Sequence, residues 1–501
     1  VLQLATQQRH SDYYIRLLSE WQHETQRKPI VAQLLPHLDN IYAALEWAFE
    51  HGSFERFSRS IIPFTEFHAY AGLIWNLNHL VNTYYQKLQE KLANSKADDA
   101  GSSLQEISTA LTYANGILKI WFNDLVQGEV LLQQAMAQIQ QHGYWYLAAS
   151  TERYLGVTCR WNQRFEEARQ HFQQALHYAQ EQQQTDIRIS TLISLAISAN
   201  LQGRFTEGED YLQQTLQLLQ QYPEIHFESV YYRTYGDMCH AQGHWTKALE
   251  ALQKAIEISS QQKKPAEEYH KIGKLLWQSG RYEQSKEYLE RVDGASQNYI
   301  YRPGTYWHTE WLIDFANLYT AWQQPEQALF YGQLAREHAQ KQGHKVLLGR
   351  AQKVEGAAQL QLEQWDAATQ NLTQALALFR ETNAQDHACA ALTQLLQLHL
   401  TLEDEAEIRT YSEDIWQLLH SGKLDMTNAE PIKAWWACYL SLRALGDARA
   451  ETAFHSALEL FQAQQAQIED KAWRKDFSTQ ITEHRDLLRA SQSPLSFTAI
   501  D

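Results

Sequence analysis

Small side chains return along this chain at an almost constant interval. The positions lie 37 to 43 residues apart and are Gly116, Gly156, Ala196, Gly236, Gly273, Ala316, Gly356, Leu396 and Cys438, with Leu396 marking a degenerate copy. A period of this length indicates stacked helical hairpins, because each hairpin is one supersecondary unit that repeats along the chain. The period constrains the fold more strongly than any local pattern, and it predicts an all-α solenoid.

The segment 231–262 shows the repeating unit most clearly. It predicts two amphipathic helices, Tyr231–Gln242 and Thr246–Ser259, joined by a tight turn at Gly243. Small residues are expected where two helix backbones touch, despite a cost of about 1 kcal/mol for glycine inside a helix. Large residues such as Trp245 and Leu252 are expected to fill the wedge between the helices. A single hairpin cannot bury both of its faces, so neighbouring hairpins must supply the rest of the core.

This alternation of small and large residues resembles the tetratricopeptide repeat, here with about 40 residues per repeat instead of the usual ~34. The resemblance implies a right-handed superhelical α-solenoid of about nine helix hairpins over residues 104–465. Residues 1–93 are predicted to form a helical N-terminal segment, and the polar residues 94–103 a linker. Residues 466–501 are predicted to form a C-terminal capping helix and tail.

Two short patterns stand in the N-terminal segment, RH-x-x-YY and L-x-x-LDN-x-x-AALEWA-x-x-x-G. Asp39 and Asn40 predict a helix start through side-chain capping, and Gly52 predicts the end of that helix. The patterns resemble the junction in bacterial STAND-type signalling ATPases, among them transcription regulators, where the nucleotide-binding part leads into a tetratricopeptide array. The matching residues are Arg9, His10, Tyr13, Tyr14, Leu38, Asp39, Asn40, Ala43, Ala44, Leu45, Glu46, Trp47, Ala48 and Gly52. The resemblance implies a nucleotide-binding module upstream, and because the sequence opens on Val1 we expect a piece of a longer protein.

The charge of the chain argues against two classes of partner. Lys and Arg total 43 against 59 Asp and Glu, a formal net charge of −16, so we expect no direct binding to nucleic acid or to a membrane. No apolar run approaches the ~18 residues of a transmembrane helix, and no signal peptide is visible. The four cysteines are scattered without a CxxC pair, which predicts buried, reduced thiols in a cytoplasmic protein.

Sequence motifs for catalysis are missing from the chain. It has no P-loop, HExxH, GxSxG, dinucleotide-binding or EF-hand pattern. Its 21 histidines are scattered singly, and the nearest metal-like spacing, His240 and His244, is broken by Gly243. We therefore expect no enzymatic activity, no metal and no cofactor.

The first helix of each hairpin is predicted to line the concave side of the solenoid. Residues three and four apart stack on one helical face, and the inward positions carry cations that alternate with aromatic residues. The predicted ligand-binding residues are Tyr113, Trp121, Arg153, Arg160, Trp161, Arg233, Asp237, His240, His270, Lys274, Trp277, Arg350 and Lys353. Arginine beside aromatic rings suits an acidic or carboxylate-ended peptide, or an acidic protein surface. Alternatively, the cations pair with Asp and Glu of neighbouring repeats and the tryptophans belong to the core.

These patterns favour a binding protein. We expect the sensor region of a STAND-type regulator, which binds a peptide, a protein or a small effector on its concave face and relays occupancy to an upstream ATPase. The alternative is a passive scaffold or adaptor that holds two proteins together. The sequence leaves open the ligand, the oligomeric state and whether the parent protein acts in transcription, defence or another process.

Overall fold

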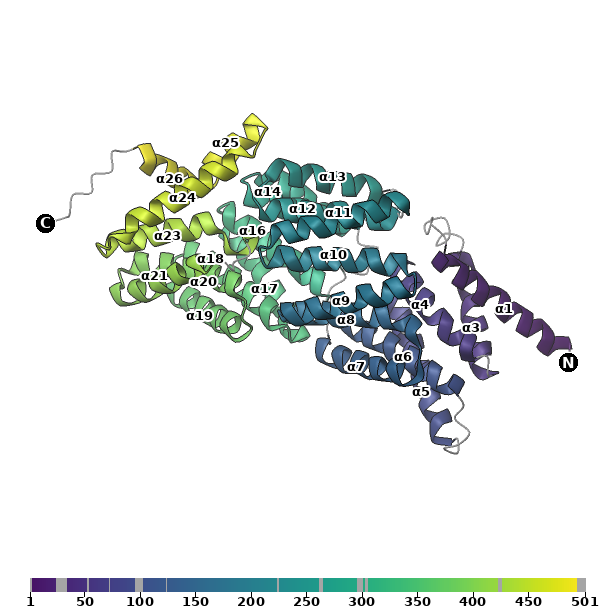
Figure 1. Cartoon of the computed structure of the whole chain (residues 1–501). Coiled ribbons are helices and arrows are strands. Elements are labelled where there is room, and N and C mark those ends of the chain that lie inside the picture. Colours follow the sequence, from purple (N-terminus) through teal and green to yellow (C-terminus); the bar gives the residue numbers. More distant parts are fainter. Residues whose placement is uncertain are drawn as a thin grey trace. The chain divides into compact units, whose positions relative to one another are not determined.

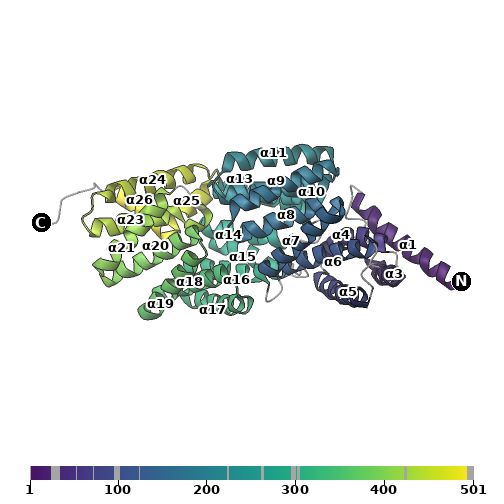
Figure 2. The same cartoon turned by 60° about the horizontal axis from the view of Figure 1, so that its bottom comes forward.

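The fold is all-α, as the repeat period predicts. The computed structural model describes residues 2–23, 34–51, 54–71, 73–94, 102–122, 124–222, 225–260, 265–294, 301, 305–421 and 426–492, and every regular element in these ranges is a helix. Within each unit, consecutive helices pack as hairpins and neighbouring hairpins pack on one another (Figures 1 and 2). The described residues form two compact units, Val1–Ser198 with Asp210–Tyr231 (unit 1) and Ala199–Glu209 with Tyr232–Asp501 (unit 2).

Unit 1 contains the N-terminal helices and the first hairpins. Its elements are α1 (Leu2–His23), the 3-10 turn η1 (Leu35–His37), α3 (Leu38–Glu50), α4 (Phe54–Ala71), α5 (Ile74–Asn94), α6 (Ser102–Trp121), α7 (Leu125–His142), η2 (Trp145–Leu147), α8 (Ala148–Trp161) and α9 (Phe165–Glu181). Three further helices contribute residues to both units: α10 (Thr185–Leu201), α11 (Phe205–Gln221) and α12 (Ile225–Ala241).

One local prediction in unit 1 is wrong. Helix α3 begins at Leu38, one residue before Asp39, and its N-cap residue His37 makes no side-chain capping bond. Asp39 therefore lies in the first turn, where its charge favours the helix dipole instead of capping a backbone N–H. Gly52 and most of the predicted linker lie outside the described residues.

Unit 2 continues the hairpins to the C-terminus. Its helices are α13 (Trp245–Ser260), α14 (Ala266–Gln278), α15 (Tyr282–Gly294), α16 (Tyr306–Ala321), α17 (Pro325–Gln342), α18 (Lys345–Gln361), α19 (Trp365–Glu381), α20 (Gln385–Leu402), α21 (Glu405–His420), α22 (Met426–Ala429), α23 (Pro431–Ala444), α24 (Arg449–Ala466), α25 (Lys471–Thr479) and α26 (Thr482–Gln492). The segment 231–262, which shows the repeating unit most clearly, forms most of α12 and α13 around the turn at Gly243, as predicted. Helix α12 begins six residues before Tyr231.

The repeated glycines lie where the two helices of a hairpin touch. A methyl group built on Gly356 would come within 2.6 Å of Cγ of Leu372, which is buried on α19. The residue 16 positions after each anchor glycine takes the same place in the pairs Gly116 and Leu132, Gly156 and Phe172, Gly236 and Leu252, Gly273 and Leu289, and Gly356 and Leu372. At the degenerate copy the sizes are inverted, with Leu396 on the first helix and Ser412 on the second. The prediction of shared surroundings for the anchor glycines is confirmed.

The turn inside each hairpin needs one residue in the left-handed backbone region. The positive-φ residues of these turns are Gln163, Gly203, Gly243, Gly280, Gln323, Glu363, Glu403 and Gly446, so the 40-residue period appears again in the backbone angles. Side chains other than glycine strain this conformation by about 1–2 kcal/mol.

We expect Glu363→Gly, at φ 58°, to stabilise the fold by about 0.5–1 kcal/mol, because relief of the backbone strain exceeds the entropy that glycine adds to the unfolded chain. The measurement is the urea midpoint of unfolding. Gly343→Ala is the reverse variant, since φ is 66° and a methyl group there meets no atom within 4 Å. Glu459→Gly, on an exposed helical position, should instead lose about 1 kcal/mol. A loss at Glu363 equal to that at Glu459 would contradict the backbone argument.

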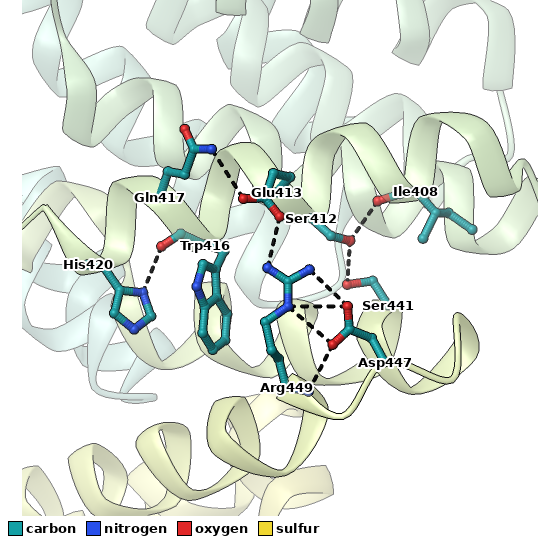
Figure 3. Close-up of polar contacts among 9 residues, drawn as sticks. All are labelled: Ile408, Ser412, Glu413, Trp416, Gln417, His420, Ser441, Asp447 and Arg449. Atoms are coloured by element: carbon teal, nitrogen blue, oxygen red, sulfur yellow. Dashed lines mark hydrogen bonds and ion pairs between the residues drawn. The ribbon is translucent and has the colours of Figure 1, made fainter. Parts of the chain in front are cut away.

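An arginine ties the last full hairpin to the one before it. The Arg449 guanidinium on α24 donates to Glu413 Oε2 on α21 at 2.8 Å and to both carboxylate oxygens of Asp447, and it lies 5.2 Å from the ring centre of Trp416 (Figure 3). Beside it, Ser412 Oγ donates to Ser441 Oγ at 2.8 Å. Arg164 on the edge of α9 makes the corresponding bond to Glu129 on α7 at 2.6 Å. Such bonds connect adjacent hairpins at their outer edges.

A buried carboxyl makes the stability of unit 2 depend on pH. Burial raises the pKa of Glu355 on α18 to about 7, although Arg336 Nε lies 3.0 Å from its Oε1 and acts in the opposite direction. The folded protein therefore holds this proton more tightly than the unfolded chain, so its contribution to stability is complete below pH 4.5 and is lost as pH rises through about 7.

We expect Glu355→Gln to stabilise unit 2 at pH 8 by about 1–3 kcal/mol relative to its effect at pH 5, because the amide carries no charge to bury. The check is the difference in thermal midpoint between variant and wild type, measured at both pH values. Glu326→Gln, at an exposed position on α17, is the matched control and should show no such change with pH. A constant difference for Glu355→Gln would show that the wild-type carboxyl titrates normally.

Candidate ligand-binding cavity

The inner helices of unit 2 surround a cavity with a volume of about 300 Å³. Its wall includes Trp277 on α14, Asn317 on α16, Lys353 and Gln361 on α18 and Gln394 on α20. These first helices of successive hairpins were predicted to form the concave lining. The volume falls within the range of about 300–1,000 Å³ that is typical of small-molecule and cofactor sites.

The C-terminal helices pack against the first hairpins of unit 2 and complete the wall of this cavity. Helix α25 lies beside α13 and α14 in both views (Figures 1 and 2), and the ring centres of Phe477 and Trp245 are 5.7 Å apart. Thr246 Oγ1 donates to the carbonyl of Gln467 at 3.2 Å, across 221 residues of sequence. Phe477, Ile481, Thr482, Glu483 and His484 thereby become part of the cavity wall.

The cavity wall carries two kinds of side chain. Aromatic rings come from the first hairpins of unit 2 and from the C-terminal helices, namely Trp245, Trp277, Tyr282 and Phe477. Amide and charged side chains come from α16 to α26, namely Asn317, Lys353, Gln361, Gln394, Glu430, Lys433 and Glu483. A ligand with one apolar group and several hydrogen-bonding groups matches this lining.

Several polar atoms on the wall are buried without a partner. Among the described residues, Nε1 of Trp245 and Nε1 of Trp277 donate no hydrogen bond, and Oε1 of Gln361 and Oε1 of Gln394 accept none. The amide nitrogen of Gln361 is used, because it donates to the carbonyl of Thr320 at 2.9 Å. An unpaired buried donor or acceptor costs about 1–3 kcal/mol. These four atoms are covered by neighbouring atoms, so a ligand gains this free energy when the side chains turn toward it and it supplies the missing partners.

Titratable groups on the wall are held in defined charge states. Burial lowers the pKa of His240 to about 3 and that of His484 to about 3, so both imidazoles are neutral at pH 7. The Nδ1–H of His484 donates to the carbonyl of Phe477 at 2.8 Å. Lys433 and Glu430 form an ion pair at 2.5 Å. Burial also lowers the pKa of Lys353, whose ammonium has no ion-pair partner within 4 Å in the described part of the chain.

A second, smaller cavity of about 20 Å³ shares Trp277, Gln278, Asn317, Lys353 and Glu430 with the first. A buried polar network surrounds it. His270 Nε2 lies 2.9 Å from Asp314 Oδ2 and His270 Nδ1 lies 3.0 Å from the Tyr301 hydroxyl. Arg350 pairs with Glu310, which also accepts from the Tyr306 hydroxyl at 2.7 Å. Oδ1 of Asp314 has no partner among the described residues.

The predicted ligand-binding residues of unit 2 divide into two groups. His240, Lys274, Trp277, Arg350 and Lys353 line one cavity or the other, so the structure brings them together. Arg233, Asp237 and Arg350 form ion pairs with Glu267 and Glu268, with Lys271 and with Glu310 respectively, and His270 is hydrogen-bonded to Asp314. Arg350 therefore belongs to both groups. For those four positions the alternative interpretation, pairing between neighbouring helices, describes the structure.

The predicted residues of unit 1 lie apart from any described cavity. Tyr113 is buried and its hydroxyl lies 2.5 Å from Ser150 Oγ, and Trp121 meets the ring of Tyr154 edge to face. Arg153 lies over the Tyr154 ring at 4.2 Å, whereas Trp161 is 41 % exposed. Burial, and then the charge of Arg153, lower the pKa of Arg160 to about 10. Their role in binding stays a prediction.

Sequence reasoning missed the contribution of the C-terminal helices to the cavity. The sequence carries no signal for this contact, because Gly203 and Gly446 hold the same turn position as Gly243 and Gly280 with nothing within 4 Å. Only the coordinates show that methyl groups built on Gly243 and Gly280 would approach Gln464 Cγ at 2.8 Å and the Asp476 carbonyl at 2.9 Å. These two glycines therefore serve a close approach of the C-terminal segment as well as the turn itself.

Two further findings concern the described residues as a whole. None of their helices is long and apolar enough to cross a membrane. Cys159, Cys239, Cys389 and Cys438 are all buried and form no disulfide, in agreement with the predicted packing thiols.

The sequence matches the tetratricopeptide repeat family over residues 188–261 and again over residues 266–299. The first match spans α10 to α13 and the second begins at α14, so the repeats lie in the hairpins described above. The chain thus contains tetratricopeptide repeats in these two ranges, and its described residues have an all-α, tetratricopeptide-like solenoid fold. No curated protein matches the sequence.

Solved structures with similar helical arrays come from three kinds of regulator. A Rap protein complexed with competence and sporulation factor is 15 % identical, with a TM-score of 0.49, and the alignment covers 68 % of this chain and 97 % of that one. The Rap conjugation gene regulator of plasmid pLS20 with the Phr* peptide is 13 % identical, with coverages of 86 % and 96 % and a TM-score of 0.39. A STAND protein with a tetratricopeptide repeat sensor from Pyrococcus horikoshii is 13 % identical, with coverages of 80 % and 55 % and a TM-score of 0.34. The function of the present chain therefore has to be argued from its own residues.

Proposed function

We propose that this chain is the ligand-binding arm of a STAND-type signalling regulator and that it holds a peptide segment in the cavity of unit 2. The observation that carries the proposal is the pair of unpartnered indole donors and the pair of unpartnered amide acceptors on the cavity wall. A peptide backbone supplies both a donor and an acceptor at each residue, and it therefore satisfies both kinds of group at once.

The charges of the wall favour a particular kind of peptide. Lys433 and Glu430 neutralise each other, while Lys353 is a cation without an ion-pair partner in the described residues. A carboxylate of the peptide placed near Lys353 would restore the charged state that burial disfavours. The proposed ligand is therefore a short peptide with an apolar side chain that contacts the aromatic rings of the wall and a carboxylate that pairs with Lys353.

The link to STAND regulators rests on the N-terminal patterns. Their residues lie on α1 and α3, which pack against each other, and Ser11 Oγ on α1 donates to the carbonyl of Ala44 on α3 at 2.7 Å. The described residues of the two patterns thus form one structural unit, as expected of a junction between modules. Reading the gene upstream of Val1 tests this part directly: a P-loop sequence supports it, and an upstream region without one contradicts it.

Selection from a phage-displayed library of random peptides tests the binding proposal. We expect the wild-type chain to enrich related sequences, and the variant Gln394→Leu with Trp277→Phe to lose about tenfold or more in affinity for them, because it removes two of the unpartnered groups. Gln417→Leu, at an exposed position of α21 outside the cavity, is the matched control. Equal affinity of the cavity variant and the control would refute the site, and enrichment of no peptide would favour the adaptor alternative.

A further inference from the structure

The contact between the C-terminal helices and the first hairpins of unit 2 consists of a small apolar centre with polar bonds at its edges. Phe477 packs on Trp245 at the centre, and Arg281 at the edge lies 3.2 Å from Asp470 Oδ1 and 3.5 Å from Asp476 Oδ2. The Arg281 guanidinium also lies 5.3 Å from the ring centre of Trp473. Partly exposed ion pairs of this kind contribute little to stability, so the polar edge holds the contact only weakly.

The helices that make this contact are short. Helix α25 has 9 residues and α26 has 11, and residues 467–470 connect them to α24. Isolated helices below about 12–15 residues are marginal in water, so these two depend on docking for their order. Trp473, Phe477 and Leu487 are buried in the core of unit 2, so undocking exposes apolar surface, but a local segment can still open at a lower free energy than the domain as a whole.

The same helices supply one wall of the cavity. Phe477, Ile481 and His484 face the space that Trp245 and Trp277 line from the other side. A ligand that packs on Trp245, Trp277 and Phe477 therefore contacts the first hairpins of unit 2 and the C-terminal helices together. Anything that binds only when both walls are present stabilises the docked arrangement by mass action.

We propose that α25 and α26 are a clasp: they undock to admit the peptide and are held shut by its apolar side chain, which packs against the cavity faces of Trp245, Trp277 and Phe477. The ligand class is a peptide with an aromatic or large aliphatic side chain, and this part rests on the function proposed above. In this proposal Phe477 and Ile481 belong to the ligand site, and the opening of the C-terminal helices limits the rate of association.

Hydrogen exchange of the ligand-free chain tests the clasp without any peptide. Gly280 and Gly203 both have positive φ, but a methyl group at Gly280 would meet the Asp476 carbonyl at 2.9 Å whereas one at Gly203 would meet nothing within 4 Å. Gly280→Ala should therefore speed exchange in residues 471–492 by about tenfold or more, while Gly203→Ala leaves those amides within about twofold of wild type. Equal exchange in the two variants overturns the proposal, as does exchange of residues 471–492 at the rate of α23 in the wild type.

A cysteine pair provides the second arm. The methyl position of Gly280 lies 3.2 Å from Cβ of Gln480, and a disulfide needs about 3.5–4.5 Å, so the two segments have to separate slightly in Gly280→Cys with Gln480→Cys. The reduced form of this variant is expected to open readily, as Gly280→Ala does, whereas the disulfide of the oxidised form locks the clasp. A fluorescein-labelled copy of the top-ranked library peptide should associate about tenfold or more slowly with the oxidised protein than with the reduced one. Equal rates overturn the clasp. If the library yields no peptide, the proposed function fails while hydrogen exchange still decides whether the clasp opens.

Discussion

Gly356→Leu is expected to lower the stability of unit 2 by about 3 kcal/mol or more, although leucine is a far better helix former than glycine. The gain in helix propensity is about 1 kcal/mol. Against it, the first added carbon would lie 2.6 Å from Cγ and 2.8 Å from Cδ2 of Leu372, which is fully buried between the helices. Overpacking of a dense core costs about 1–3 kcal/mol even for small additions, and here the whole isobutyl group has to be accommodated.

The measurement is the urea midpoint of unfolding, combined with hydrogen exchange at α18 and α19. Ala406→Leu, at an exposed position on α21, adds apolar bulk without a clash and should leave the midpoint nearly unchanged. The pair Gly356→Ala with Leu372→Ala should lose less than the sum of the two single losses, because the added methyl group enters the space that the leucine leaves. Strict additivity would mean that the two residues do not share that space.

Arg350→Met is expected to destabilise unit 2 by about 3–5 kcal/mol, because it leaves Glu310 as an unpaired buried carboxylate. Both partners are less than one-tenth exposed. Burial alone would raise the pKa of Glu310, but the charge and hydrogen bond of Arg350 lower it to about 2. Without the arginine, burial prevails and the carboxyl binds a proton near neutral pH.

The pH dependence of the variant's stability tests whether the loss comes from the unpaired carboxylate of Glu310. In the wild type the ion pair contributes its stability above pH 4.5 and loses it as pH falls toward about 2. In Arg350→Met the deficit should be largest at pH 8 and smaller at pH 5, where protonation neutralises Glu310. The double variant Arg350→Met with Glu310→Gln should recover most of the thermal midpoint, and its affinity for library peptides then shows whether Arg350 also contacts the ligand. No recovery in the double variant would mean that the ion pair is not the source of the loss.

Much of the fold could be predicted from the sequence because the strongest contacts are local. An anchor glycine and the large residue that covers it are 16 positions apart, so the same pair recurs at five of the nine anchors and becomes visible without coordinates. The degenerate copy at Leu396 hid this pattern because its large and small residues are exchanged with respect to Ser412. Complementary volume, not residue type, is what the hairpin requires.

The candidate site could be predicted only in part. The sequence placed Trp277 and Lys353 on the inner face of their helices, since helical periodicity determines that face. It could not say which cations find partners, because Glu310 and Arg350 lie 40 residues apart on different helices and the bond depends on how those helices pack. Phe477 and Ile481 also lie outside the repeat pattern, so their place in the cavity wall could not be predicted. The contacts of this segment with α13 to α15 join parts of the chain about 200 residues apart.

The closure of unit 2 limits how this protein can evolve. An open array gains or loses whole repeats with little penalty, because each unit touches only its neighbours. Here Gly243 and Gly280 must meet Gln464 and Asp476 after a fixed angular advance. Duplication or loss of one hairpin between them would move α25 and α26 away from their contact with α13 and α14. The number of hairpins in this segment is therefore fixed, unlike the number of repeats in most repeat proteins.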